Sequence, residues 1–277
     1  MIGAMTHFSL RFAPLFLSLL GATAHAQSRD HVVDGNEGYL IGASMSSSSS
    51  HVGNAKVQFN LKPMWAFQLG SVRISRSRAG SLMGAGKEKL ETGLSTQFNL
   101  FSDWDVGASL RIDNGRSFDE DPALAGLPDV RDTVRARFST GRSFGPRWSW
   151  RVSVDQDLLG RAGGLRLNQG VGYRLPVDEQ TFLDFSLGTT WGSRRYMQTQ
   201  YGIDPAAAQA TGRRPFVLGN GWERLRAGVQ YTHAINDKWV LFGEAEMSNL
   251  LRQASRSPLV GRVSTHGLSF GIAYRGK

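Results

Sequence analysis

Apolar and polar residues alternate with a period of two along segments of about ten residues, and such segments recur through most of the chain. In LSTQFNLFSDWDVGASLRI, residues 94–112, the even-numbered positions are mostly apolar and the odd-numbered positions mostly polar. The alternation returns in RARFSTG, WSWRVSV, LRLNQGVGY, RLRAGVQY, WVLFGEAEM and LSFGIAY. Successive side chains of a strand point to opposite faces, so the pattern predicts strands with one apolar face. That face could meet lipid around a barrel or the core of a soluble sandwich.

The alternation predicts about twelve strands, most of a length that crosses a bilayer at a tilt. No helical period competes over a long window. The predicted strands lie near residues 37–46, 54–61, 64–76, 90–101, 103–113, 130–141, 147–157, 165–174, 181–192, 222–232, 238–249 and 262–274.

The predicted connections alternate between short and long. Short turns fall at Lys62-Pro63, Ser102, 142–146, 175–180 and 233–237, and longer segments such as 114–129 and 193–221 fall between them. Outer-membrane barrels have short periplasmic turns and longer outer loops, whereas a Greek-key sandwich has no reason to alternate in this way. The sequence therefore predicts an all-β, antiparallel transmembrane outer-membrane β-barrel with both termini on the periplasmic side.

Aromatic residues accompany the short turns. Trp65, Trp104, Trp148 and Trp239 each follow one of them, and Phe101 lies beside Trp104. Tryptophan is enriched where a membrane protein meets the head groups. We therefore predict that these residues form an aromatic ring at the periplasmic interface.

The N-terminus has the features of an export signal. Arg11 precedes the apolar run FAPLFLSLL, which is too short to span a bilayer as a helix, and Ala24-His25-Ala26 follows. We predict a secretory signal peptide over residues 1–26 and a single barrel domain over residues 27–277 in the Gram-negative outer membrane.

Charge and composition exclude several functions. The net charge is +9, but an exported protein has little access to nucleic acid, so outer-membrane lipid and lipopolysaccharide phosphates are the expected anionic partners. The chain has no cysteine, no Gly-x-Ser-x-Gly and no histidines at metal-ligand spacing. The acidic cluster 119–121 is interpreted as a solvated loop. We predict no enzymatic activity, no cofactor and no metal.

The polar faces of the predicted strands carry many charges, which a barrel would direct into its lumen. Buried charges must be paired or hydrated. Ion pairs could fill the lumen, which is the interpretation we favour, or an electropositive channel could admit anions. The predicted lumen charges are Arg111, Arg135, Arg137, Arg151, Arg166, Asp184, Arg224, Arg226, Glu244 and Glu246.

Three blocks between about residue 110 and the end of the chain resemble the MipA/OmpV family of MltA-interacting outer-membrane proteins. The first block is GR followed by LAGLPDV, the second is RRYMQTQYGID, and the third is LLRQASRSPLVG. The residues that carry the resemblance are Gly115, Arg116, Leu127, Asp129, Tyr196, Met197, Tyr201, Gly202, Ala254, Ser257 and Pro258.

The resemblance implies a non-enzymatic scaffold or interaction protein for murein-synthesising and murein-hydrolysing complexes, or a role in envelope integrity. Its implied partners are a periplasmic lytic transglycosylase and a penicillin-binding protein. The alternative function is a narrow, anion-preferring outer-membrane channel. A barrel enzyme acting on lipid and a soluble secreted sandwich are the less favoured readings. The predicted topology places the Tyr196 and Pro258 blocks at the outer mouth, so we expect them to be structural and to close the barrel mouth. Partner contact should then use the short turns or the N-terminal tail.

Overall fold

The computed structural model describes residues 37–53, 57–76, 82, 93–101, 103–116 and 121–276. The predicted signal peptide and part of the acidic cluster, Asp119 and Glu120, lie outside the described residues.

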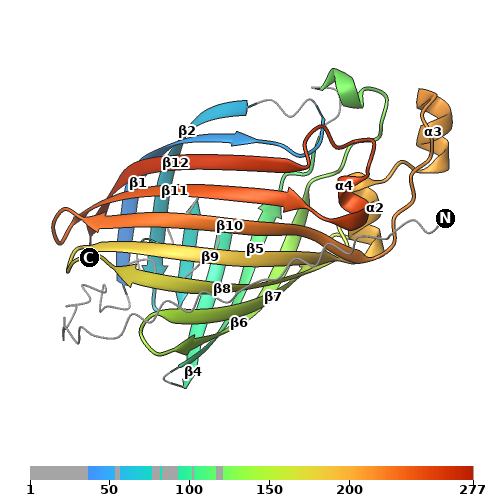
Figure 1. Cartoon of the computed structure of the whole chain (residues 1–277). Helices are drawn as coiled ribbons and strands as arrows, with labels where there is room; N and C mark the ends of the chain where they lie inside the picture. The colour runs from blue at the N-terminus through green and yellow to red at the C-terminus, as the bar shows by residue number, and fades with distance from the viewer. Residues whose placement is uncertain are drawn as a thin grey trace, which may run out of the picture.

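Twelve antiparallel strands form a closed barrel in which each strand pairs with its neighbours in sequence and β1 pairs with β12 (Figure 1). The strands are β1 (Glu37–Ser49), β2 (Val57–Leu69), β3 (Val72–Arg76), β4 (Gly93–Phe101), β5 (Trp104–Asp113), β6 (Thr133–Phe144), β7 (Trp148–Asp157), β8 (Leu165–Pro176), β9 (Thr181–Gly192), β10 (Gly221–Ala234), β11 (Trp239–Leu250) and β12 (Ser264–Gly276). The predicted fold class and strand number are confirmed.

The period-two pattern determines which side chains face out. On β2, Phe59 is 81% exposed and Leu61 is 73% exposed, whereas Met64 and Ala66 of the opposite face are buried. In the segment 94–112, Phe98 and Leu110 of the even-numbered face are exposed. A sandwich core would bury these side chains, so the apolar face is the outer wall of the barrel, as in barrels that cross a membrane.

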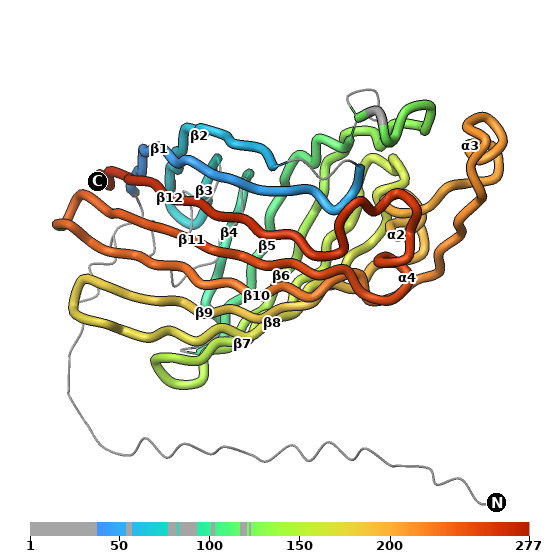
Figure 2. The backbone as a smooth tube through the Cα atoms, turned by 45° about the horizontal axis from the view of Figure 1, so that its top comes forward, coloured from blue at the N-terminus to red at the C-terminus, as the bar shows by residue number. Residues whose placement is uncertain are grey.

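The two ends of the barrel differ. Short turns lie at one end, where β12 also ends, and the long connections that carry η1, α2, α3 and α4 lie at the other (Figures 1 and 2). The helices are η1 (Pro122–Leu124), α2 (Arg194–Tyr201), α3 (Pro205–Thr211) and α4 (Arg252–Ser255). In the described part of the chain, no helix is long and apolar enough to cross a membrane. The predicted alternation of short and long connections is confirmed.

One predicted turn is wrong. β2 runs without interruption through Lys62 and Pro63, and the turn to β3 falls at Gly70 and Ser71 instead. β3 pairs with β2 only as far as Trp65, so the described pairing of Pro63 is with β1 alone. Proline lacks the N–H that a central strand needs, and an edge-like position of this kind tolerates it.

The turn-side half of the lumen is partly apolar. Leu40 of β1, Met64 and Ala66 of β2, Phe242 of β11 and Ala273 of β12 are buried together with Leu82. Phe242 belongs to the continuous apolar run WVLF, in which both faces of β11 are hydrophobic. The lumen is therefore not lined by charge throughout.

Candidate functional site: the loop-side mouth

Loops from several parts of the barrel meet in one apolar core at the loop end. We call this cluster the mouth plug. Its members come from the β1–β2, β5–β6, β9–β10 and β11–β12 connections and from Leu250, the last residue of β11. Its buried members are Val52, Leu124, Leu127, Tyr196, Met197, Tyr201, Ile203, Ala207, Ala208, Leu218, Leu250, Ala254 and Leu259. Loops that share a packed core do not move independently, so these connections form one packed unit at the loop-side mouth.

Helix α2 forms the centre of the plug. Ser193 is its N-cap, and the Ser193 hydroxyl accepts a hydrogen bond from the backbone N–H of Tyr196. The same hydroxyl accepts the N–H of Leu165 at the start of β8, which fixes the helix to the wall. Tyr196, Met197 and Tyr201 form the buried face of α2. The helix thus directs both tyrosines down towards the lumen.

Both tyrosine hydroxyls donate hydrogen bonds to Glu223. Its Oε1 accepts a hydrogen bond from the Tyr196 hydroxyl at 2.9 Å and from the Tyr201 hydroxyl at 2.7 Å, and it forms an ion pair with Arg224. Glu223 has 0% exposure. Burial raises the pKa of both tyrosines and the nearby carboxylate raises it further, so the phenols stay protonated and act as donors.

A register shift between Trp222 and Arg224 explains why Glu223 faces inward. Strict alternation from Leu225 would place Glu223 on the lipid face, where an unpaired carboxylate is unfavourable. Glu223 is not among the residues predicted from the sequence. It could have been found from the sequence, because it is a charged residue at a position where the alternation predicts an outward-facing apolar side chain.

The family blocks tie the plug together across long sequence distances. The Ser257 hydroxyl donates to the carbonyl of Tyr201 at 2.6 Å, and a guanidinium N–H of Arg116 donates to the carbonyl of Gln200 at 3.2 Å. Burial lowers the pKa of Arg116 to about 10, which still leaves it a cation at neutral pH. Gly115 has φ +61°, and a Cβ there would lie 1.9 Å from the carbonyl oxygen of Val130. Only glycine fits this position.

A buried histidine joins the first and last loops. Nδ1 of His51 lies 3.0 Å from the carbonyl oxygen of Arg262, which can only accept, so Nδ1 carries the proton. Nε2 lies 3.1 Å from the hydroxyls of Ser248 and Thr265, which can donate to it. Burial lowers the pKa of His51 and favours this neutral form.

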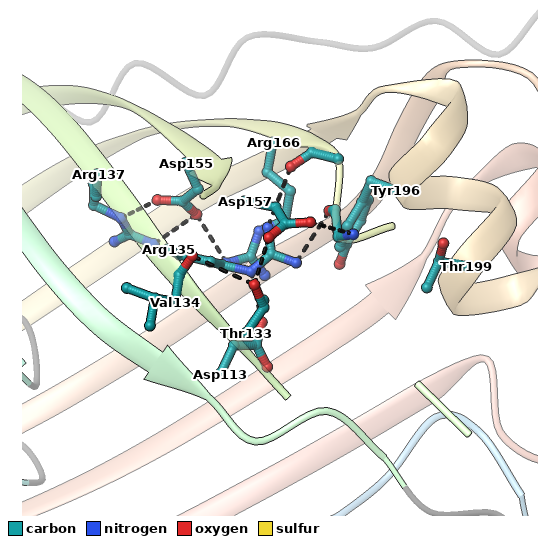
Figure 3. Close-up of polar contacts among 12 residues, drawn as sticks. Asp113, Thr133, Val134, Arg135, Arg137, Asp155, Asp157, Arg166, Tyr196 and Thr199 are labelled. Atoms are coloured by element: carbon teal, nitrogen blue, oxygen red, sulfur yellow. Dashed lines mark hydrogen bonds and ion pairs between the residues drawn. The ribbon is translucent and has the colours of Figure 1, made fainter. Parts of the chain in front are cut away.

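A layer of paired charges lies directly beneath the plug (Figure 3). Arg135 donates through Nε to Asp113 at 2.6 Å and through Nη2 to the carbonyl of Gly163 at 3.0 Å. Asp155, with 0% exposure, pairs with Arg137 and lies 2.9 Å from Arg166. We call these five charged residues, Asp113, Arg135, Arg137, Asp155 and Arg166, the charge layer. Their pairing meets the requirement for burying them.

Tyr196 connects the mouth plug to the charge layer. The guanidinium carbon of Arg166 lies 5.3 Å from the centre of its ring, and that of Arg135 lies 5.8 Å from it. Both distances are in the range of a cation–π interaction. The same side chain therefore packs in the plug, donates to Glu223 and covers two lumen arginines.

The remaining predicted lumen charges lie outside the charge layer. Arg151 pairs with Asp105 at 3.0 Å, and Asp184 pairs with Arg174 at 2.7 Å, both in the turn-side half. Arg111 stands opposite Arg135 in the β-register. Arg226 has no hydrogen bond or ion pair within the described residues. Glu244 and Glu246 lie on the inner face of β11, opposite Gln230 and Gly228. The aspartates of β5 and β7 were not predicted as lumen charges, although they share a face with the predicted arginines.

The predicted family residues converge on the plug with two exceptions. Leu127, Tyr196, Met197, Tyr201, Ala254 and Ser257 are buried there. Gly202 ends α2, and its N–H donates to the carbonyl of Gln198 at 2.8 Å. Asp129 and Pro258 are exposed.

Four of the five predicted interface aromatics lie at strand ends beside the short turns, and Trp65 does not. Trp104, Trp148 and Trp239 are the first residues of β5, β7 and β11, and Phe101 is the last residue of β4, opposite Trp104. Trp148 packs on Tyr173 with ring centres 4.8 Å apart. Trp65 does not follow a turn, because the predicted turn at Lys62-Pro63 does not exist, and it lies within β2.

The described residues contain no group of three or more histidines and carboxylates placed to hold a metal ion. At the loop-side mouth, the described residues instead form an apolar core above a layer of paired arginines and carboxylates. A closed antiparallel barrel with an apolar outer wall, short turns at one end and folded loops at the other is an outer-membrane β-barrel.

The chain belongs to the family of the MltA-interacting protein MipA, whose family model matches residues 33–276. A sequence search of curated proteins gives no match.

Several solved structures are weakly similar. The toluene transporter TbuX of Ralstonia pickettii is 12% identical with a TM-score of 0.41, and the similarity covers 90% of this chain and 91% of that one. An outer-membrane channel from Pseudomonas putida F1 is 13% identical with a TM-score of 0.42, covering 89% and 97%. An anion-selective porin from Comamonas acidovorans is 9% identical with a TM-score of 0.41, covering 87% and 98%. At these values the similarity carries no information about what this chain binds.

Proposed function

We propose that this protein is a non-enzymatic outer-membrane barrel with a closed lumen that serves as a scaffold for murein-synthesising and murein-hydrolysing complexes. The family description supports this proposal, because it names an interaction with MltA. The observation that carries it is the mouth plug. A barrel whose outer mouth is filled by a buried loop core is better suited to holding a partner than to passing solutes.

The same topology indicates where a periplasmic partner would bind. Outer-membrane barrels have their long loops outside and their short turns in the periplasm. The plug, with most of the family residues, then lies on the far side of the membrane from murein. The surface left for a lytic transglycosylase or a penicillin-binding protein is the ring of short turns with the N-terminal tail. The exposed apolar wall contacts outer-membrane lipid in this arrangement.

Site-specific photo-crosslinking in intact cell envelopes tests this proposal. A crosslinking residue replaces Arg147, Asp178 or Lys238 in three separate short turns, all of which are exposed. Matched controls carry it at Arg214 and Arg252 on the loop side, also exposed. We expect crosslinks to a murein enzyme from the turn positions alone. Crosslinks from the loop positions alone, or from none of the five, would contradict the scaffold.

A narrow anion channel is the second candidate, and Arg226 is the observation that favours it. This guanidinium faces the lumen without a hydrogen-bond acceptor or an ion-pair partner among the described residues, as an anion-attracting group in a channel would. Single-channel recording in planar bilayers separates the two functions. The closed-lumen proposal predicts no large conductance. A large anion-selective conductance that Arg226→Glu shifts towards cations would establish the channel instead.

A further inference from the structure

The two ends of the barrel carry opposite charge balance. The β9–β10 connection (193–220) and the β11–β12 connection (251–263) contain seven arginines and a single acidic residue, Asp204. The five short turns contain four acidic residues and two basic ones. The arginines of the two loops are Arg194, Arg195, Arg213, Arg214, Arg252, Arg256 and Arg262. The β5–β6 connection (114–132) at the same end contains five acidic residues and two arginines, so the excess of positive charge lies on the side of the rim formed by the β9–β10 and β11–β12 connections.

Three of these arginines lie where the barrel wall ends. Arg194 comes two residues after the end of β9, Arg252 two residues after the end of β11, and Arg262 two residues before the start of β12. All three side chains are exposed. We call them the rim arginines. A residue at the end of a membrane-crossing strand lies at the level of the lipid head groups.

The rim arginines have no internal counter-charge. None of the three guanidiniums has a hydrogen-bond or ion-pair partner among the described residues. Asp204, the one acidic residue of the two loops, already caps α3, because its carboxylate accepts the N–H of Ala207 at 2.7 Å. The backbone beneath is nonetheless fixed, since the N–H and C=O of Arg262 both contact His51. The backbone that carries Arg262 is thus held by His51, and its side chain is exposed.

Apolar side chains lie on the wall just below the rim arginines. Val263 follows Arg262 directly and is 40% exposed, and Met247 of β11 is 65% exposed. Trp222, at the loop-side end of β10, is also exposed. A surface with cations above exposed apolar side chains matches a lipid with an anionic head group above acyl chains.

We propose that the rim arginines bind the phosphate groups of the phosphorylated glycolipid of the outer leaflet, lipopolysaccharide. The inference rests on the orientation in the proposed function, with the loop end outside. It is distinct from the scaffold, because it uses the opposite end of the barrel. It assigns a lipid-binding role to loop arginines that do not belong to the matching residues of the family blocks.

Two paired variants test the proposal at equal change of net charge. The loop-end variant carries Arg194→Gln and Arg262→Gln, and the turn-end control carries Arg147→Gln and Lys238→Gln, which are exposed cations of the short turns. Binding of purified full-length barrel to lipopolysaccharide is measured in bicelles of zwitterionic lipid. Each arginine near an anionic surface contributes about fivefold in affinity, so we expect the loop-end variant to bind on the order of 25-fold more weakly. The turn-end control should bind as the unchanged protein does.

Two further ligands identify the chemistry and its source. Lipopolysaccharide stripped of phosphate should bind weakly to every variant, and the phosphorylated core sugar without acyl chains should bind more weakly than the intact glycolipid. Equal loss in both paired variants, or equal binding of the dephosphorylated lipid, would overturn the proposal. Equally tight binding of the soluble core sugar would show a site for soluble polyanions instead of lipid.

Folding is controlled with Arg194→Lys combined with Arg262→Lys, which keeps both charges and should retain binding within about fivefold. If the glutamine pair fails to fold while the lysine pair folds and binds no lipopolysaccharide, the proposal is also wrong. Crosslinking from Arg147 and Lys238 to murein enzymes is unaffected by either outcome. Failure of lipid binding and failure of the scaffold are therefore distinguishable.

Discussion

Glu223 is a buried carboxylate that accepts hydrogen bonds from two tyrosines of α2 and pairs with Arg224 of its own strand. It is the point where the mouth plug meets the barrel wall. Removing a partner from such a group leaves a buried charge without compensation, which costs more than the original interaction contributes.

Glu223→Ala should lower the free energy of unfolding by about 3–5 kcal/mol, because Arg224 and both phenols lose their acceptor. Glu223→Gln keeps an acceptor oxygen and should cost less. Glu246→Ala is the matched control, since Glu246 faces the same lumen from β11 without a described hydrogen bond. Urea unfolding of the reconstituted barrel measures all three. If Glu246→Ala lowered the free energy of unfolding as much as Glu223→Ala does, the contacts of Glu223 would not be the cause of the loss.

His51 should make the loop closure sensitive to acid. Burial lowers its pKa below the ordinary value of 6.5, so the unfolded chain takes up the proton first as pH falls. The stability from neutral His51 is complete above pH 6.5 and declines as pH falls from there towards the folded-state pKa. The urea midpoint should drop between pH 7.5 and 5.5, and His51→Gln should reduce that drop. The exposed His266→Gln serves as control, and an unchanged pH dependence in His51→Gln would contradict the expectation.

At the scale of the element, each strand has a lipid face and a lumen face fixed by residue parity. β5 shows this clearly, because Leu110 and Ile112 are exposed on one face while Asp105 and Asp113 form ion pairs on the other. Ala108 shares the face of Leu110 and stands opposite Phe138, which is 65% exposed.

Ala108→Lys should therefore cost about 2–4 kcal/mol of folding free energy in lipid, because the ammonium would lie near the bilayer midplane. Ile112→Lys, on the same face but near the loop end, should cost only about 0–1 kcal/mol. Unfolding in lipid vesicles measures the difference. If the two lysines cost the same, the assigned depth of β5 in the membrane is incorrect.

The family blocks of α2 and the β11–β12 loop should act in folding and not in partner binding. Tyr196→Ala removes a buried aromatic side chain, so we expect a loss of about 3–5 kcal/mol and less heat-stable folded barrel on unboiled gels. Pro258 is exposed, and Pro258→Ala should change stability by no more than about 0.5 kcal/mol. The double variant should resemble Tyr196→Ala and keep its periplasmic partner. Loss of the partner from a normally folded barrel would refute this assignment.

At the scale of the whole molecule, closure is the main stabilising device of a chain without cysteine. β1 and β12 pair over ten residues, which removes the open edges of the sheet. β1 begins at Glu37, and its pairing with β12 runs from Tyr39 to Ser48.

We expect the protein isolated from outer membranes to begin at Gln27, because the Ala24-His25-Ala26 pattern is typical of signal-peptidase cleavage. N-terminal sequencing or intact-mass measurement checks this directly. Ala26→Pro should block processing and leave the leader attached. A mature protein that retains residues 1–26 would disprove the predicted export signal.

The sequence by itself determined the wall of the barrel. A strand places alternate side chains on opposite faces whatever its neighbours, so local alternation was enough to count twelve strands and to identify the lipid face. The alternating connection lengths added the antiparallel order. The same alternation predicted which arginines face the lumen. It also applies to the aspartates of β5 and β7, which occupy lumen-facing positions of their strands.

The predicted topology placed the Tyr196 and Pro258 blocks at the outer mouth, but tertiary structure alone decided which side chains pack together there. Val52, Leu127, Tyr201 and Leu259 are far apart in sequence and carry no shared pattern, so only the folded barrel brings their loops into one core. The inward turn of Glu223 depends on a register shift between two strands, and β2 runs through Pro63 because it pairs with β1 along its whole length. Parity is a property of a single strand, whereas pairing register and loop packing are properties of neighbours, which no local pattern specifies.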